Sequence, residues 1–272
     1  MLSNRRDTVA PGGLATLVDE LQTKGQYSFR KADAAERLHA SDTALGAALR
    51  RLAHKGRIVR PKRGFYVLVP LEYRQSGAPP ASWFIDDLMR FLQQSYYVGL
   101  LTAASLHGAS HLKPQEFEVV VEKPLRAFAV GRVRVRFFTK RRLEKTPVVS
   151  VKTETGSMRV STPEATALDL IRYARSIGHL GNVVTTLTEL AAALDSQRLV
   201  EAARADVDVT CVQRLGYVLE RLGFRAVVGP LAQWLETARP RTTPLNPGGP
   251  AKPIRQDDRW MVLVNEEVEP ER

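Results

Sequence analysis

The sequence predicts an α+β protein in which an N-terminal winged helix-turn-helix is followed by a larger, mixed α+β domain. Residues 1–70 give the order helix, short strand, helix, turn, helix and hairpin, which is typical of a winged helix. Beyond a polar segment with a proline pair, strand-like runs precede a series of helical patterns. The predicted boundaries are 1–71 for the winged helix, 72–82 for a linker and 83–272 for the second domain.

The helices of the winged helix are predicted by apolar residues at helical spacing. The first helix ends near Lys24-Gly25, a short strand follows at 27–29, and the second helix covers 30–40. Ser41 is the expected N-cap of the third helix, at about 42–55, and Gly56 ends it. Two strands, 57–61 and 64–69, join around the turn 61–64. The inward residues of the first and third helices are Leu14, Leu17, Val18, Leu21, Leu45, Ala48, Leu49 and Leu52.

Positive charge is concentrated in this first domain. The net charge is +11, and residues 1–70 hold 13 Lys and Arg against 6 Asp and Glu. Seven cations and no acid lie between residues 50 and 63, on the third helix and the hairpin, where they favour binding to the phosphates of double-stranded DNA. A winged helix that is structural or docks a protein is the alternative. The candidate DNA-binding residues here are Thr43, Ala47, Arg50, Arg51, Lys55, Arg60, Lys62 and Arg63.

The second domain is predicted to hold a small sheet followed by a helical half. Helices are expected at 83–95 and 96–108, and strands at 116–123, 130–140 and 148–161, the last a hairpin near Gly156. Thr162 is the expected cap of the next helix, with Pro163 as its first residue. Further helical patterns cover 180–194, 196–205, 209–223 and 227–238.

A proline-rich arm follows the last helical pattern. Residues 239–253 contain five prolines and two glycines, so we expect an extended segment without regular structure. The strand expected at 259–265 carries Trp260, Val262 and Val264, which favours a chain that returns to dock on the sheet over the alternative, a free tail.

A second basic segment lies at 123–143, with eight Lys and Arg and no acid. Arg132, Arg134 and Arg136 alternate with apolar residues, so strand periodicity places them on one outer face. Arg141 and Arg142 extend this patch. A second DNA-contacting surface, a dock for an acidic partner and a merely solvated face all remain open.

The sequence offers little for catalysis, cofactors or membranes. It has no long apolar run, no signal peptide and a single cysteine, Cys211, which together favour the cytoplasm. Neither a phosphate-binding loop nor a dinucleotide motif is present, and the spacing of His107 and His111 lacks supporting ligands, so we predict no cofactor, no metal site and no enzyme. Two alternatives stay open: a metal-dependent nuclease using Glu116, Glu118 and Glu122, and a ligand-sensing transcription factor, for which no pocket chemistry is visible.

The chain resembles the AbiEi family of antitoxins of type IV toxin–antitoxin systems. The resemblance rests on "RRLAHKGRIVRPKRGFYVLVP", on "YYVGLLTAASLHGA" and on "STPEATALDLIRY". It implies a winged helix that represses its own operon at inverted repeats. It also implies a C-terminal domain that counters a co-encoded nucleotidyltransferase-like toxin, in abortive infection as a defence against phage. The matching positions are Leu49, Arg51, Leu52, Gly56, Ile58, Arg60, Arg63, Gly64, Tyr66, Ala103, His107 and Gly108.

Overall fold

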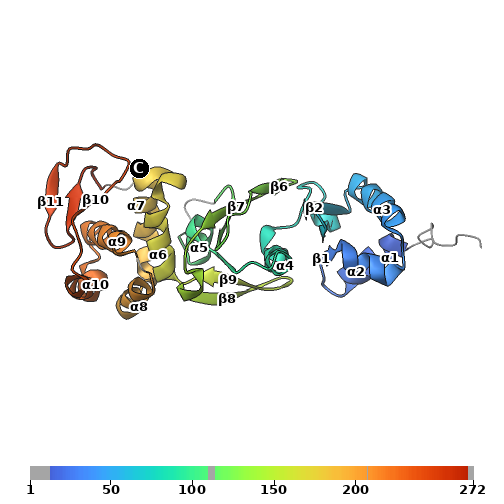
Figure 1. Cartoon of the computed structure of the whole chain (residues 1–272), viewed down its shortest axis with the longest axis horizontal. Coiled ribbons are helices and arrows are strands. Elements are labelled where there is room, and N and C mark those ends of the chain that lie inside the picture. The colour runs from blue at the N-terminus through green and yellow to red at the C-terminus, as the bar shows by residue number, and fades with distance from the viewer. Residues whose placement is uncertain (1–12, 110–113, 207, 269–272) are drawn as a thin grey trace, which may run out of the picture. The chain divides into compact units, whose positions relative to one another are not determined.

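The structure is a computed structural model that describes residues 13–109, 114–206 and 208–268 (Figure 1). Its N-terminal part confirms the predicted winged helix. The elements are α1 (Gly13–Thr23), β1 (Ser28–Arg30), α2 (Lys31–Leu38), α3 (Asp42–His54), β2 (Ile58–Lys62) and β3 (Phe65–Leu68). The three strands form an antiparallel sheet in the order β1-β3-β2.

Local signals in the sequence fix the position of α3. The Ser41 hydroxyl accepts a hydrogen bond from the Ala44 amide at 3.3 Å, so the predicted cap is confirmed. Gly56 adopts a φ of +64° just beyond the helix, a conformation that a residue with a β-carbon adopts only with strain. The inward leucines of α1 and α3 share one core with Phe29, Ile58, Tyr66 and Leu68.

The middle of the chain builds a second sheet, which has six strands within the described residues. Its order is β6-β7-β5-β4-β9-β8, with β4 parallel to β9 and β6 antiparallel to β7. The elements in chain order are η1 (Leu71–Tyr73), η2 (Ala81–Trp83), α4 (Ile85–Phe91), β4 (Tyr96–Val98), α5 (Leu100–Leu106), β5 (Phe117–Val121), β6 (Phe128–Val130), β7 (Val133–Thr139), η3 (Leu143–Lys145), β8 (Val148–Thr153) and β9 (Gly156–Ser161).

Three predictions for this region are wrong in detail. The single helix expected at 96–108 is strand β4 followed by the short helix α5, because Tyr96, Tyr97 and Val98 form an inner strand that is buried on both faces and shows no alternation. The single strand expected at 130–140 is a hairpin that turns at Gly131, where φ is +54°. The helix expected at 83–95 is shorter, since α4 ends at Phe91.

The helical half follows the predictions closely, and Figure 1 shows its helices grouped together. Thr162 caps α6 by accepting from the Ala165 amide at 3.3 Å, and Pro163 is its first residue, as predicted. The helices are α6 (Pro163–Arg172), η4 (Ala174–Ser176), α7 (His179–Leu190), η5 (Ala191–Ala193), α8 (Ser196–Ala205), α9 (Val209–Arg221) and α10 (Arg225–Ala238).

The last segment docks, but not where the sequence suggests. Strands β10 (Thr243–Pro244), β11 (Arg255–Asp257) and β12 (Val262–Val264) form their own sheet, ordered β10-β12-β11, so the predicted return to the larger sheet is wrong. Two residues of the proline-rich arm pair with β12, which corrects the expectation of an arm without regular structure. Docking itself is confirmed, because Trp260 is fully buried and lies where a β-carbon on Gly216 would be.

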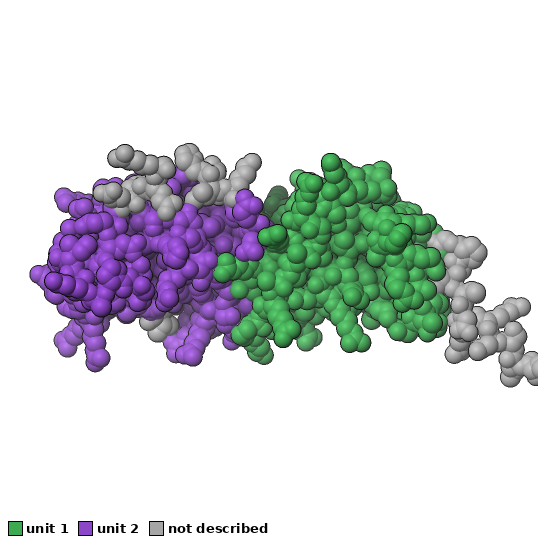
Figure 2. Space-filling model, turned by 90° about the horizontal axis from the view of Figure 1, so that it is seen from above, with its two compact units in different colours: residues 1–96, 123–137, 150–158 green, residues 97–122, 138–149, 159–272 purple. Residues whose placement is uncertain are grey.

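The chain forms two compact units, coloured in Figure 2. Residues 1–96, 123–137 and 150–158 make up the first, called here the N-terminal unit. Residues 97–122, 138–149 and 159–272 make up the C-terminal unit. The β6–β7 hairpin therefore belongs mainly to the same compact unit as the winged helix, although more than fifty residues separate them in sequence.

Candidate nucleic-acid interface

The outward face of α3 is lined by small residues at its start and by cations further on. Thr43, Gly46, Ala47 and Arg50 follow the spacing of a single helical face, and none of them is buried. A β-carbon added at Gly46 would lie 3.8 Å from Arg50 Nη1, so the Arg50 side chain runs back along the helix over this glycine. This face therefore combines small residues with an arginine that lies along them.

Further cations extend this face toward the end of the helix. Arg50, Arg51 and Lys55 are exposed, and none has an ion-pair partner within the part of the chain that the structure describes. Three other cations of the winged helix are paired with acids of the same unit. The paired set is Lys31 with Asp42, Arg37 with Glu20, and Arg57 with Asp19. The structure thus leaves unpaired positive charge on the outward side of α3.

The wing carries two exposed arginines and one lysine with a different role. Arg60 and Arg63 are exposed, and Gly64 completes the turn with a φ of +87°. Lys62 is half-buried instead: its Nζ donates to the Arg126 carbonyl oxygen at 2.9 Å and lies 5.4 Å from the centre of the Phe128 ring. Burial, and then the charge of Arg126, lower the pKa of Lys62 below its usual value.

The β6–β7 hairpin is also fixed to segment 72–82, which follows the wing in the N-terminal unit. The Arg132 amide donates to the Ser76 carbonyl oxygen at 2.7 Å. A β-carbon on Gly131 would lie 2.2 Å from that same oxygen, so only glycine permits this approach. The segment 72–82 is correspondingly well packed, with Ala78 and Ala81 buried.

The basic residues of the hairpin differ in exposure. Arg132 in the turn and Arg134 on β7 are both exposed. Arg136 is half-buried and makes a contact of its own. Arg132 and Arg134 have no ion-pair partner among the described residues. Arg126, exposed just before β6, adds a cation beside the wing. All eleven candidate DNA-binding residues lie in the N-terminal unit, on α3, on the wing or on this hairpin.

Two residues of this surface were missed in the sequence. Gly46 lies inside a helical pattern, where glycine costs about 1 kcal/mol relative to alanine. A glycine at such a cost is a sequence signal for a packing or functional role at that position. Arg126 carries no sequence signal for its place, because only the fold brings residues 126–128 to the wing.

The carboxylates that suggest a nuclease have other contacts. Glu118 is buried, and its Oε2 accepts from the Leu101 amide at 2.7 Å and from the Thr102 amide at 3.3 Å. It therefore stabilises the first turn of α5. Glu122 is exposed, and no group of three potential ligands is found among the described residues.

The remaining candidates of the sequence also lie in structural settings. His107 Nε2 is 2.7 Å from the Ser161 carbonyl oxygen, while His111 lies outside the described residues. Cys211 is buried in α9, and burial raises the pKa of its thiol well above the usual value. In the described ranges, no helix is both long and apolar enough to span a membrane.

The fold and this surface define a winged-helix protein of mixed α+β structure. A family model described as transcriptional regulator, AbiEi antitoxin, matches residues 17–69. A second, described as AbiEi antitoxin C-terminal domain, matches residues 97–221. The chain belongs to the AbiEi antitoxin family, and the resemblance stated from its motifs is confirmed.

One solved structure supports the fold over nearly the whole chain. The crystal structure of the RV2827C protein from Mycobacterium tuberculosis is similar with a TM-score of 0.64 and 17% sequence identity, covering 96% of this chain and 94% of that one. At this identity the likeness shows the fold alone. A comparison with curated proteins finds no match.

Proposed function

We propose that this antitoxin-family protein is a DNA-binding autorepressor that recognises inverted repeats in its own operator. The proposal rests on the unpaired cations of α3, the wing and the β6–β7 hairpin, which one compact unit holds. Arginine and lysine side chains neutralise phosphates and release counterions, which supplies most of the sequence-independent affinity for DNA. Such a protein acts in the cytoplasm, beside the chromosome.

Within this surface the residues have different tasks. Thr43 and Ala47, with Gly46 between them, face the major groove and read base edges, whereas Arg50, Arg51 and Lys55 contact phosphates. Arg60 and Arg63 on the wing and Arg132 and Arg134 on the hairpin contact phosphates as well. Arg136 adds less because it is half-buried, and Lys62 supports the wing from inside.

Binding to the promoter of its own operon tests this proposal. Arg51→Ala with Arg63→Ala removes two unpaired cations, and the slope of log affinity against log salt concentration falls in magnitude by about 0.9 for each arginine that no longer neutralises a phosphate. The matched control, Arg37→Ala with Arg90→Ala, removes the same charge from two arginines that are paired with acids. If both double variants reduce affinity and slope equally, the proposal fails, because net charge alone then explains binding.

We further propose that the C-terminal unit counters a nucleotidyltransferase-like toxin encoded beside this gene. The match of residues 97–221 to the antitoxin C-terminal domain supports this part. Co-expression with the neighbouring reading frame tests it: growth arrest by the neighbour alone, and recovery with this protein, are expected. The double variant Arg51→Ala with Arg63→Ala, which should bind DNA more weakly, is expected to restore growth as well. That result would separate toxin neutralisation from DNA binding. A neighbour that causes no arrest, or arrest that persists, contradicts the antitoxin role and leaves DNA binding intact.

A further inference from the structure

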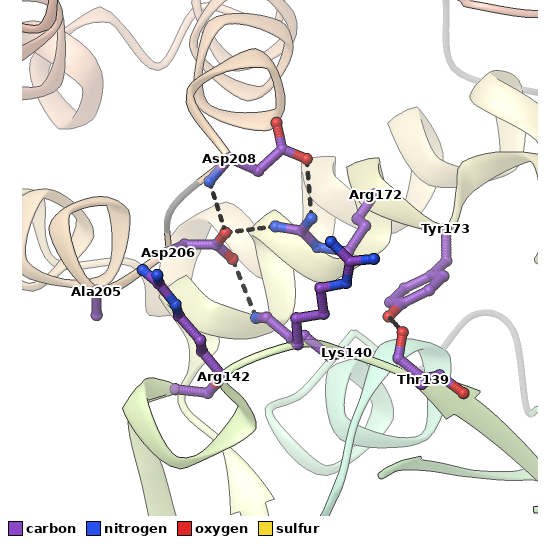
Figure 3. Close-up of a pocket in the computed structure, with 10 residues that line it drawn as sticks. Thr139, Lys140, Arg142, Arg172, Tyr173, Ala205, Asp206 and Asp208 are labelled. Carbon is purple, nitrogen blue, oxygen red and sulfur yellow. Dashed lines mark hydrogen bonds and ion pairs between the residues drawn. The ribbon is translucent and has the colours of Figure 1, made fainter. Parts of the chain in front are cut away.

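A pocket of about 560 Å³ opens in the C-terminal unit (Figure 3). Its walls come from the end of β7, the loop that leads into η3, the end of α6, and the facing ends of α8 and α9. The volume lies in the range typical of sites for small organic ligands, and is far larger than a lone inorganic anion needs.

The floor of the pocket is a buried network of paired charges. Lys140 Nζ lies 2.9 Å from Asp169 Oδ1 and 3.0 Å from Asp206 Oδ2. Arg172 pairs with Asp206 and, at 2.8 Å, with Asp208. Figure 3 shows Asp206 held between Lys140 and Arg172. Every charge in this network is paired, so the floor is a rigid polar base, although two cations against three carboxylates leave it a net charge of −1.

The mouth, in contrast, carries positive charge that no acid balances. Arg141 and Arg142 are exposed and have no ion-pair partner in the described part of the chain. Arg142 has a φ of +55°, a left-handed conformation that an arginine adopts only with strain.

An aromatic wall completes the pocket. The Tyr173 hydroxyl donates to the Thr139 carbonyl oxygen at 2.7 Å, and the Tyr173 ring meets the Phe138 ring edge-on at 5.1 Å between centroids. Both contacts fix the ring, which is only partly buried and lines the pocket (Figure 3). A fixed aromatic face near free guanidinium groups suits a ligand that has both a planar ring and a phosphate.

We propose that this pocket binds a nucleotide, with its phosphates on Arg141 and Arg142 and its base against Tyr173. The paired floor gives a phosphate no free carboxylate to repel it, because each acid there is held by a cation. An acidic peptide needs a long groove along a chain, whereas this pocket has the volume of a site for one small molecule. The site is separate from the DNA-binding surface, since all its residues belong to the C-terminal unit.

Calorimetric titration of the full chain, without DNA, tests the proposal. ATP, AMP, adenosine and inorganic phosphate are the probes. We expect ATP and AMP to bind at least about tenfold more tightly than adenosine or inorganic phosphate. Adenosine lacks the contacts to the arginines, and inorganic phosphate lacks the contact to Tyr173. Absence of ATP binding, or equal affinity for ATP and inorganic phosphate, overturns the assignment.

A matched pair of variants locates the site. Arg141→Ala with Arg142→Gly removes the mouth arginines, and glycine suits the left-handed backbone, so the unfolding temperature should not fall. ATP affinity falls about tenfold or more. Lys145→Ala with Arg198→Ala removes equal charge from exposed positions outside the lining and leaves ATP affinity unchanged. Unchanged ATP affinity in the first variant overturns the site, and if its DNA affinity falls instead, these arginines contact DNA.

Discussion

Lys62, at the tip of the wing, donates a hydrogen bond to the main-chain oxygen of Arg126, 64 residues further along the chain. The contact fastens the wing to the segment that leads into the β6–β7 hairpin. Burial of Lys62, and then the charge of Arg126, lower the pKa of Lys62. Like charges held close together are disfavoured on their own, and a bound polyanion relieves that repulsion. We therefore expect the wing and the hairpin to act as one basic surface.

Lys62→Met separates a supporting role of this lysine from a DNA contact. Methionine keeps an apolar stem over Phe128 but has no ammonium group, so we expect a loss of about 1 kcal/mol in the free energy of unfolding and an unchanged salt slope of DNA binding. Arg63→Ala, at the next position, should do the reverse: stability changes by less than about 0.5 kcal/mol, and the slope falls by about 0.9. Urea unfolding and salt titrations of promoter binding measure both. A slope that falls equally in the two variants makes Lys62 a phosphate contact.

Gly46 offers a test of the recognition helix. Gly46→Ala should raise the free energy of unfolding by about 1 kcal/mol, since glycine is unfavourable inside helices and the nearest side-chain atom would be 3.8 Å away. Gly46→Leu should also fold but bind promoter DNA more weakly, because its side chain would project from the face of α3 that we propose enters the major groove. Thermal unfolding and DNA titrations compare the two. Equal DNA affinity in both variants means that this face of α3 stays away from DNA.

The sequence predicts the winged helix well because its signals are local. Leucine spacing, the Ser41 cap and the Gly56 stop are each decided within a few residues of α3. It fails for β4, where Tyr96, Tyr97 and Val98 are all buried and their continuous apolar run is as suitable for a helix as for an inner strand.

The candidate site shows the same division between local and distant signals. The charge of Arg50, Arg51 and Arg63 is visible in the sequence, but the place of Lys62 against Arg126 depends on a contact across 64 residues. The pocket of the C-terminal unit was invisible for the same reason, since Lys140, Arg172 and Asp206 come from three separate segments. Gly131 carries a turn signal that the strong alternation around it obscures.

Gly131→Ala tests whether the hairpin is locked to the segment before α4. Its β-carbon would lie 2.2 Å from the Ser76 oxygen, so the hairpin must shift. Gly25→Ala is the control, because Gly25 also has a positive φ, +70°, but open space around it. We expect Gly131→Ala to cost at least about 2 kcal/mol more in urea unfolding, and to weaken promoter binding. Equal losses in stability show that the hairpin tolerates the displacement.

The buried charge network predicts sensitivity to acid. Burial opposes ionisation of Asp206, but Lys140 and Arg172 outweigh it and lower the pKa of Asp206 below its usual value of 3.8. A lowered pKa gives stability that is present above pH 3.8 and is lost as the pH falls through the pKa of the folded state. Asp206→Asn should cost about 3 kcal/mol at pH 7, and its free energy of unfolding should fall less than that of wild type between pH 7 and pH 3. Parallel pH profiles of urea unfolding contradict this account.

The central claim is that α3, the wing and the hairpin present one surface to DNA. Its most direct test is the salt dependence of promoter binding for Arg51→Ala with Arg63→Ala, for Arg132→Ala with Arg134→Ala, and for all four changes together. Because the four arginines are exposed, losing each pair should reduce the magnitude of the slope of log affinity against log salt concentration by about 1.8. The combined variant should reduce it by about 3.6. A hairpin pair that leaves affinity and slope at their wild-type values contradicts the claim and restricts DNA binding to the winged helix.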